Sequence, residues 1–274
     1  MRKPPRPARV HASSAGALAA RNELAATCVL TAACALGAAA CTRNPPPPSA
    51  SVRADAGVDA AETPPLVGGN AESAVRRWTF ELADVSLAIA DAGMSRALDT
   101  ILVRTHAELV VNGAFFDERG APRGLAIDHG KILSPYVSTM SGGVFHVDGD
   151  RGVLDATEGF AVPTPPPSFA VQCRPRLVVR GKVNIRSDDG QRAERTALCL
   201  RHDGHTLDVV LAGHGSGSGP SLLALARDLA ASGCDEALNL DGGPSTGAAF
   251  WDGATPELLA PRGPVRHAIV VKRR

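Results

Sequence analysis

Alternating apolar and polar positions dominate the chain from about residue 75 onward, and they predict a fold built mainly from strands. We expect strands over 78–90 and 101–111, where β-branched and alternating apolar residues are frequent. The later part of the chain is patterned more clearly and predicts strands over 170–184, 196–202 and 206–212, with turns at Arg180-Gly181 and Asp203-Gly204. Further expected elements are hairpins over 124–133 and 143–153, a short buried strand over 236–240 and a closing strand over 267–271. A proline-rich loop over 163–167 is expected to divide the domain into halves.

One segment has the apolar spacing of a helix. Ser221 is placed to cap its start, and Gly233 stands where a left-handed stop is expected. The apolar residues between them recur at helical spacing: Leu222, Leu225, Ala226 and Leu229. Many strands, few helices and no regular βαβ alternation predict an α+β fold with mostly antiparallel or mixed β-sheets, in a single domain over 75–274.

The first 74 residues follow another pattern. A positively charged leader precedes an apolar run over 25–40, and small residues lead to Cys41. This is the layout of an export signal, and it resembles a bacterial lipoprotein signal, in which the cysteine is lipidated after cleavage. We expect an export signal over 1–41, a membrane anchor at Cys41 and a periplasmic or outer-surface location, with simple secretion as the alternative. Residues 42–74, rich in Pro and Ala, predict a disordered linker.

The charge balance and the cysteine content limit which partners, disulfides and metal ions the sequence predicts. The 29 basic and 28 acidic side chains are balanced and aromatic residues are only 4%, which argues against a nucleic-acid partner. Three cysteines follow the leader, and we expect Cys173 and Cys199 to form a disulfide, because both flank extended segments, leaving Cys234 free. Zinc motifs are absent from the sequence, so no cofactor is expected, although Asp241 with nearby carbonyls could hold a hard divalent cation.

Two segments place polar residues and glycines at the ends of apolar runs. They are 112–117 (NGAFFD) and 239–246 (NLDGGPST). Glycine permits close approach of the backbone to a ligand, so a carboxylate in such a loop can be aimed at one. The alternative is that Asp-Gly is only a turn, and Asp203-Gly204 is expected to be one.

The ordered set of motifs resembles the phosphodiester glycosidase family. It begins with Asn112-Gly113 and Phe115-Phe116 and ends with the 236–245 stretch, EALNLDGGPS. Further matches lie between and after them in the same order: Ala170-Val171-Gln172, Pro175-Arg176-Leu177-Val178, Gly181-Lys182-Val183-Asn184, Arg195-Thr196, the 222–229 helix and Pro264-Val265. That family includes the enzyme that removes N-acetylglucosamine from a phosphodiester to uncover mannose 6-phosphate. The resemblance implies a hydrolase acting on a sugar-phosphodiester or a related envelope glycan linkage.

Such chemistry requires a carboxylate near the sugar and a cation near the phosphate. Asp241 is the first candidate for the catalytic carboxylate, followed by Asp117 and then Glu194. Arg195 is the candidate for the phosphate, because arginine matches phosphate oxygens bidentately, with Arg176 as its competitor. The expected substrate-binding residues are Asn112, Gly113, Gln172, Asn239, Gly242, Gly243 and Ser245.

The chain departs from the family pattern at several positions. Cys173 and Arg174 replace small residues, Cys199 replaces a glycine, and Pro244 replaces a third glycine and stiffens its loop. These departures motivate an alternative, a non-catalytic glycan-binding envelope lipoprotein on the same fold. A serine hydrolase is disfavoured because no GxSxG motif occurs.

Overall fold

A computed structural model describes residues 75–274. The expected export signal, the Cys41 anchor and the 42–74 linker all lie outside the described residues. Among residues 75–274, no helix has both the length and the apolar character needed to cross a membrane.

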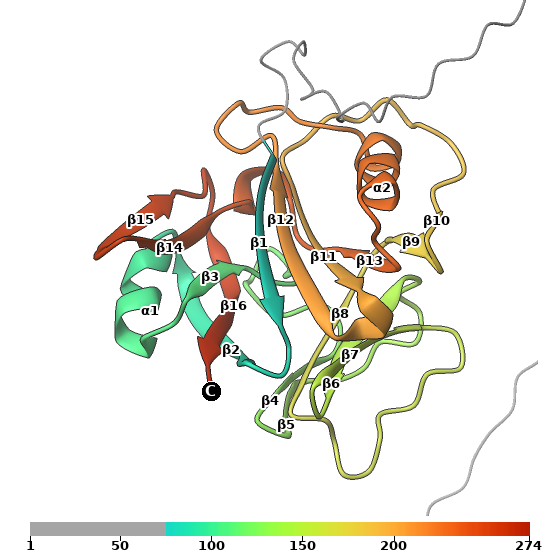
Figure 1. The fold of residues 1–274 in the computed structure, drawn as a ribbon, viewed down its shortest axis with the longest axis horizontal. Helices are drawn as coiled ribbons and strands as arrows, with labels where there is room; N and C mark the ends of the chain where they lie inside the picture. The colour runs from blue at the N-terminus through green and yellow to red at the C-terminus, as the bar shows by residue number, and fades with distance from the viewer. Residues whose placement is uncertain (1–74) are drawn as a thin grey trace, which may run out of the picture. The chain divides into compact units, whose positions relative to one another are not determined.

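The described residues form three antiparallel sheets and two α-helices (Figure 1). The first sheet has the order β1 (Val75–Glu81), β12 (Thr206–Ala212), β11 (Arg195–Arg201), β13 (Glu236–Asn239), β9 (Arg176–Val179) and β10 (Lys182–Val183). The second is β15 (Thr255–Leu259), β14 (Ala248–Asp252), β3 (Leu109–Asn112), β16 (Val265–Arg273) and β2 (Val85–Ser95). The third is β5 (Lys131–Ser134), β4 (Ala126–Asp128), β8 (Phe169–Cys173), β6 (Gly143–Asp148) and β7 (Arg151–Ala156). The helices are α1 (Leu98–Thr105) and α2 (Leu222–Ala231), and short 3₁₀ turns cover His202–Gly204 and Gly243–Ser245.

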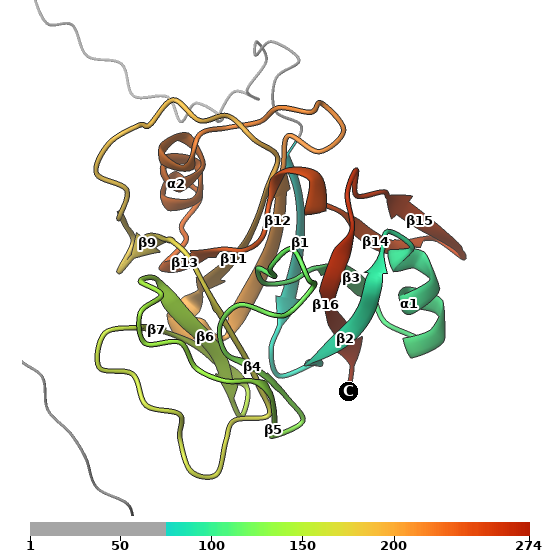
Figure 2. The ribbon, with the colours of Figure 1, turned by 180° about the vertical axis from the view of Figure 1, so that it is seen from behind.

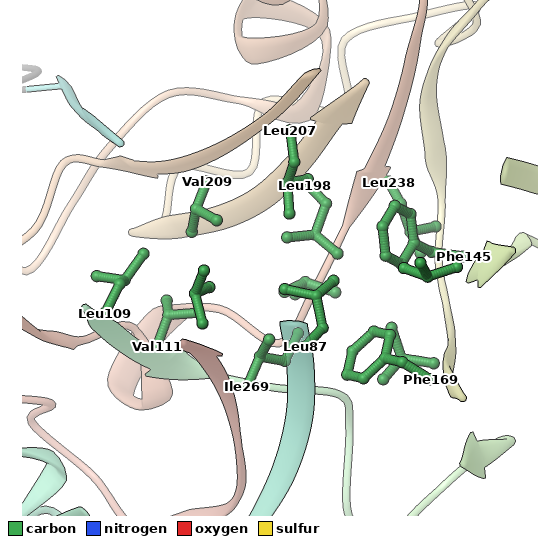
Figure 3. Packing of buried hydrophobic residues seen from close by; sticks show 14 of the residues in the cluster. Leu87, Leu109, Val111, Phe145, Phe169, Leu198, Leu207, Val209, Leu238 and Ile269 are labelled. Atoms are coloured by element: carbon green, nitrogen blue, oxygen red, sulfur yellow. The ribbon is translucent and has the colours of Figure 1, made fainter. Parts of the chain in front are cut away.

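All three sheets contribute to one hydrophobic core. Figure 3 shows Leu238 of the first sheet beside Phe145 of the third, and Val209 of the first sheet facing Leu109 and Val111 of the second. Burial of apolar side chains is worth about 25 cal/mol per Å², so this shared core holds the three sheets together.

Two of the sheets have their outer faces covered by helices. In β12, Val209 faces the shared core while Val210 packs beneath α2, as the two-residue period of a strand requires. In β3, Val111 faces the core and Val110 packs against α1. From behind, Figure 2 shows α2 beside β9 and β13, and α1 beside β14 and β15. The α+β class and the mainly antiparallel pairing are therefore confirmed.

Several expected elements are confirmed. The hairpins form between β4 and β5 and between β6 and β7. The α2 helix begins after Ser221, whose hydroxyl accepts a hydrogen bond from the Ala224 amide at 3.2 Å. Gly233 has the expected positive φ of 82°. Asp203 and Gly204 form a turn in which both have positive φ.

The expected strand over 101–111 is wrong in its first half. This segment forms the end of α1, a short connection and then β3. Leu98, Ile101 and Leu102 are buried at helical spacing against the second sheet, and this packing overrides the strand preference of β-branched residues. The expected strand over 78–90 is likewise split, because a turn after Glu81 sends β1 and β2 into different sheets.

The expected Arg180-Gly181 turn is confirmed between β9 and β10, but the segment before it is divided into β8 and β9. Pro175 follows β8, and proline cannot donate to a ladder, so the chain leaves the third sheet and enters the first there. The Pro163–Pro167 segment is a loop, as its composition predicts. It does not separate two halves, because β4 before it pairs with β8 after it.

The expected Cys173–Cys199 disulfide is wrong. Cys199 is bonded to Cys234, with the two Cα atoms 5.7 Å apart, and Cys173 is a buried free cysteine. Cys199 points to the α2 side of the first sheet, whereas Cys173 faces the shared core. Strand β11 pairs with β13, which brings Cys199 close to the turn that carries Cys234.

Candidate active site

A pocket of about 780 Å³ opens where the ends of β9, β11 and β13 meet the loop after β3. Its charged and aromatic lining consists of Phe115, Glu158, Arg174, Arg176, Arg195 and Asp241. This volume lies within the roughly 300–1,000 Å³ typical of small-molecule sites.

The two loops singled out from the sequence meet at this pocket. The Asn112 side-chain amide donates to the Asp241 carbonyl at 2.7 Å. The Asp241 amide in turn donates to the Gly113 carbonyl at 3.1 Å. Segments that are 129 residues apart are therefore joined by two hydrogen bonds.

Asn112 is a hub for this junction. Its side-chain oxygen accepts hydrogen bonds from the Thr196 hydroxyl at 2.7 Å and from the Gly247 amide at 3.2 Å. With the bond to the Asp241 carbonyl, the Asn112 side chain links β3, β11 and the Asp241 loop. It is only 1% exposed, so its amide serves the protein rather than a ligand.

Two glycines allow the loops to approach this closely. A Cβ atom at Gly113 would lie 2.8 Å from the His267 carbonyl oxygen, and one at Gly242 would lie 2.9 Å from the Glu194 backbone carbonyl oxygen. Any larger residue would force the backbone apart at either position. The loop is held further by the bond from the Gly243 amide to the Glu194 carbonyl, at 2.7 Å.

The Asp241 carboxylate is largely sheltered but lines the pocket. Burial raises its pKa above the usual 3.8, because the charged form loses hydration, while hydrogen bonds from Ser245 and the Gly242 amide act in the opposite direction. The Gly242 amide donates to Oδ1 at 2.9 Å. Asp241 is thus a positioned carboxylate whose proton is held more tightly than in water.

Three arginines share the pocket with Asp241. Arg195, at the start of β11, is half-buried and donates to the Pro220 and Gln191 carbonyls at 3.4 and 3.3 Å. Burial lowers the pKa of its guanidinium, and nearby Asp189 opposes this. These two bonds are long, so the guanidinium retains capacity for an anion.

Asp117 is placed differently from the sequence expectation. Its Oδ1 accepts from the Arg119 and Ala121 amides, both at 2.9 Å, so the carboxylate closes its own turn. The bond from Ala121 is the main reason that the pKa of Asp117 is lowered. The lining of the pocket includes Phe115 of the same loop but not Asp117.

Other expected site residues act inside the protein. Gln172 is fully buried, and its side-chain oxygen accepts from the Leu125 and Val137 amides at 3.0 Å each. The Asn239 side chain donates to the Arg174 carbonyl at 2.9 Å, while Asn239 itself lines the pocket. Ser245 is buried beneath the loop, where its hydroxyl can donate either to the Pro264 carbonyl, 3.3 Å away, or to the Asp241 carboxylate.

Glu194, the third carboxylate considered, is completely buried away from the pocket. It accepts from the Gly215 and Gly217 amides at 2.9 and 3.1 Å and from Arg262 Nε at 3.1 Å. Its full set of partners marks it as the anchor of the glycine-rich loop after β12.

Two charged residues of the lining are not predicted as site residues by the sequence. Arg174 stands out there only because it replaces a small residue, and Glu158 carries no signal because it lies in an ordinary turn. The signal that could have found Arg174 is its position two residues before Arg176 at the end of an apolar strand. In the described part of the chain, no three His, Cys, Asp or Glu side chains are grouped as metal ligands.

Comparison with known proteins supports the motif resemblance. The profile of the phosphodiester glycosidase family matches residues 105–272. A search of curated proteins gave no match.

Solved structures with the same fold are distant in sequence. The zebrafish N-acetylglucosamine-1-phosphodiester alpha-N-acetylglucosaminidase catalytic domain, auto-inhibited by its pro-peptide, is 17% identical with a TM-score of 0.55, covering 74% of this chain and 83% of that one. A hypothetical protein from Synechocystis is 16% identical with a TM-score of 0.54, covering 73% of this chain but only 59% of that one. A Burkholderia pseudomallei protein named for its expected export is 14% identical with a TM-score of 0.52, covering 72% and 73%. These likenesses show the fold, and the profile match over 105–272 shows that the chain belongs to the phosphodiester glycosidase family.

Proposed function

We propose that the protein is a hydrolase that cleaves a sugar from a phosphodiester, or a related envelope glycan linkage, in the pocket around Asp241. The observation that carries this proposal is the presence of a sheltered carboxylate and the half-buried Arg195 in one pocket of about 780 Å³. Phe115 adds an aromatic surface on the wall, which suits the apolar face of a sugar ring.

In the proposed reaction the bond between the anomeric carbon and the phosphate oxygen breaks, and water supplies the new hydroxyl group. Asp241, in its ionised form, stabilises the positive charge that develops on the sugar and activates the attacking group. The hydrogen bonds of Asn112 and Gly113 to the Asp241 backbone hold this carboxylate in place. Fixed geometry of this kind lowers the barrier, because little reorganisation is needed during the reaction.

The leaving group is a phosphomonoester, which is a stable anion and needs little help from an acid. What it needs is compensation of charge, and we assign this role to Arg195. A guanidinium keeps its charge and can present two parallel N–H groups to phosphate oxygens. Asn239, which lines the pocket and holds the Arg174 carbonyl, is assigned to positioning the wall around the substrate.

The test is release of sugar and phosphomonoester from a synthetic N-acetylglucosamine phosphodiester. Asp241→Asn should reduce kcat by about 10³-fold or more, since positioned acid–base groups contribute roughly 10²–10⁴-fold. Asp203→Asn is the matched control, because Asp203-Gly204 is the same dipeptide in a turn outside this pocket. Full activity of the Asp241 variant would contradict the assignment.

A chain that binds the phosphodiester but releases no product would instead fit the non-catalytic glycan-binding alternative. Of the departures that suggested that alternative, Arg174 lines the pocket, Cys173 is buried beside it, and Cys199 is bonded to Cys234 on the α2 side. Export and a lipid anchor at Cys41, which would place this pocket in the cell envelope, remain predictions from residues 1–41.

A further inference from the structure

The arginines of the pocket lie on both sides of Asp241. Strand β13 ends just before Asp241 and lies between β11 and β9 in the first sheet. Arg195 begins β11 on one side, and Arg176, which is paired with Leu238 of β13, begins β9 on the other. Arg174 lies two residues before Arg176 and lines the same pocket. The carboxylate therefore has one arginine on the β11 side and two on the β9 side.

These positive charges exceed what one phosphodiester needs. A phosphodiester carries a single negative charge, and Arg195 alone can neutralise it. Within residues 75–274, the guanidinium groups of Arg174 and Arg176 form no ion pair. Burial raises the pKa of Glu236 and the charge of Arg176 acts to lower it, but the two side chains form no ion pair among the described residues. Glu158 is the only carboxylate besides Asp241 among the described residues of the lining.

The two β9-side arginines are held to different degrees: Arg176 is partly buried, whereas Arg174 is exposed and is fixed through its backbone. The Arg174 backbone is held by the Asn239 side chain, whose amide donates to the Arg174 carbonyl at 2.9 Å. The aliphatic part of Arg176 packs over Gly143, where a Cβ atom would lie 2.9 Å from Arg176 Cγ. Packing therefore positions the Arg176 side chain, and the Asn239 bond positions the backbone from which the Arg174 side chain extends.

We propose, building on the function proposed above, that the substrate carries a second anionic group beyond the phosphodiester that is cleaved, and that Arg174 and Arg176 bind it. The chemical class is a polyanionic glycan, such as a chain with a further phosphate one linkage away. Arg195 faces the scissile phosphate, and the β9-side pair sets the specificity for the next anionic group along the chain. A pocket of about 780 Å³ has room for a ligand that extends past one sugar ring.

The test uses two synthetic compounds, N-acetylglucosamine phosphodiesterified to glycerol and the same compound with a second phosphate on the glycerol. The measured quantity is the ratio of kcat/KM for the doubly charged compound to that for the singly charged one. Arg174→Gln and Arg176→Gln should each lower this ratio by about tenfold, as expected for loss of a charge-assisted contact in a partly exposed site. Arg180→Gln removes the same charge from the β9–β10 turn, outside the pocket lining, and should leave the ratio unchanged.

The affinity of each compound for the Asp241→Asn variant, measured by calorimetry, separates this inference from the proposed function. Tighter binding of the doubly charged compound, lost in variants that also carry Arg174→Gln, supports the second anion site even if the wild type cleaves neither compound. Equal affinity of Asp241→Asn for the two compounds overturns the second anion site. A loss of preference as large with Arg180→Gln as with Arg174→Gln also overturns it. Cleavage of both compounds without preference would leave the proposed function standing and would likewise overturn the second anion site.

Discussion

Asp117 and Asp241 stand in similar sequence surroundings but in opposite physical environments. Each follows an apolar strand by a few residues, and each has glycine close by. Asp117 accepts two amides of its own turn, and its pKa is lowered. Asp241 is desolvated at the pocket, and its pKa is raised. The pocket is thus asymmetric, with one loop supplying the carboxylate and the other supplying the scaffold through Asn112, Gly113 and Phe115.

The difference shows that residues distant in sequence determine whether the carboxylate of a strand-end aspartate faces a pocket or closes its own turn. Partners within four residues complete the hydrogen bonding of Asp117 and leave it as a turn residue. The Asp241 loop is instead held by residues distant in sequence: the Asn112 side chain donates to the Asp241 carbonyl, and the Thr196 and Glu194 carbonyls accept from the Leu240 and Gly243 amides. Those contacts hold the loop while leaving the carboxylate facing the pocket.

The largest expected effect separates the two aspartates by activity. Asp241→Asn should reduce kcat on an N-acetylglucosamine phosphodiester by about 10³-fold or more, whereas Asp117→Asn should change it less than about threefold. Steady-state release of the phosphomonoester measures both. Equal losses in the two variants would return Asp117 to the catalytic role that its sequence suggested.

The next largest expected effect is a loss of kcat/KM when the arginine assigned to the substrate phosphate is removed. Arg195→Gln should lower kcat/KM by about 10- to 100-fold, because hydrogen bonds to charged groups are worth about 1.5–3 kcal/mol. Arg192→Gln, an exposed neighbour outside the pocket lining, serves as the control for net charge. A loss as large in the Arg192 variant would mean that long-range attraction, rather than contact, explains the effect.

Removal of the junction between the loops should mainly affect stability. Asn112→Ala leaves the Thr196 hydroxyl, the Gly247 amide and the Asp241 carbonyl without their buried partner. We expect a loss of about 2–4 kcal/mol in the free energy of unfolding, measured by urea denaturation. Asn184→Ala removes a single bond to the Arg176 carbonyl at an exposed site and should cost less than about 1 kcal/mol.

The smallest expected effects are shifts of Tm, and they should have opposite signs for the two aspartates. The raised pKa of Asp241 means that the folded state holds its proton more tightly than the unfolded state, so its contribution to stability falls as pH rises through the range above 3.8. Asp241→Asn should therefore raise Tm at neutral pH, with the gain vanishing below that range. Asp117 has a lowered pKa and adds stability above its unfolded value, which is lost as pH falls.

Calorimetric scans from about pH 3 to 7 measure both trends. Asp117→Asn should lower Tm at neutral pH and have no effect once the carboxyl is protonated. Shifts of the same sign in the two variants would contradict the environments described for them.

The sequence predicted the parts of the fold that depend on local signals. The Ser221 cap, the Asp203-Gly204 turn and the two hairpins depend on neighbouring residues, and all are confirmed. The helical part of 101–111, which ends α1, and the partner of Cys199 were mispredicted, because both are decided by packing against distant strands.

The candidate site divides in the same way. The two glycine-containing loops could be recognised by motif, and their contact through Asn112 and Asp241 is present. The separation of Asp117 from the pocket, and the presence of Arg174 in it, depend on how β8 passes from the third sheet to β9 in the first. That passage is set by three-dimensional packing, and the one local signal for Arg174 is its position two residues before Arg176 at the end of an apolar strand.

A crystal structure of Asp241→Asn with an uncleaved N-acetylglucosamine phosphodiester tests the central claim most directly. We expect the anomeric carbon about 3–3.5 Å from the side chain at position 241, with a phosphate oxygen in hydrogen-bond contact with the Arg195 guanidinium. A sugar bound beside the Asp117 turn, or a phosphate held away from Arg195, would contradict the account.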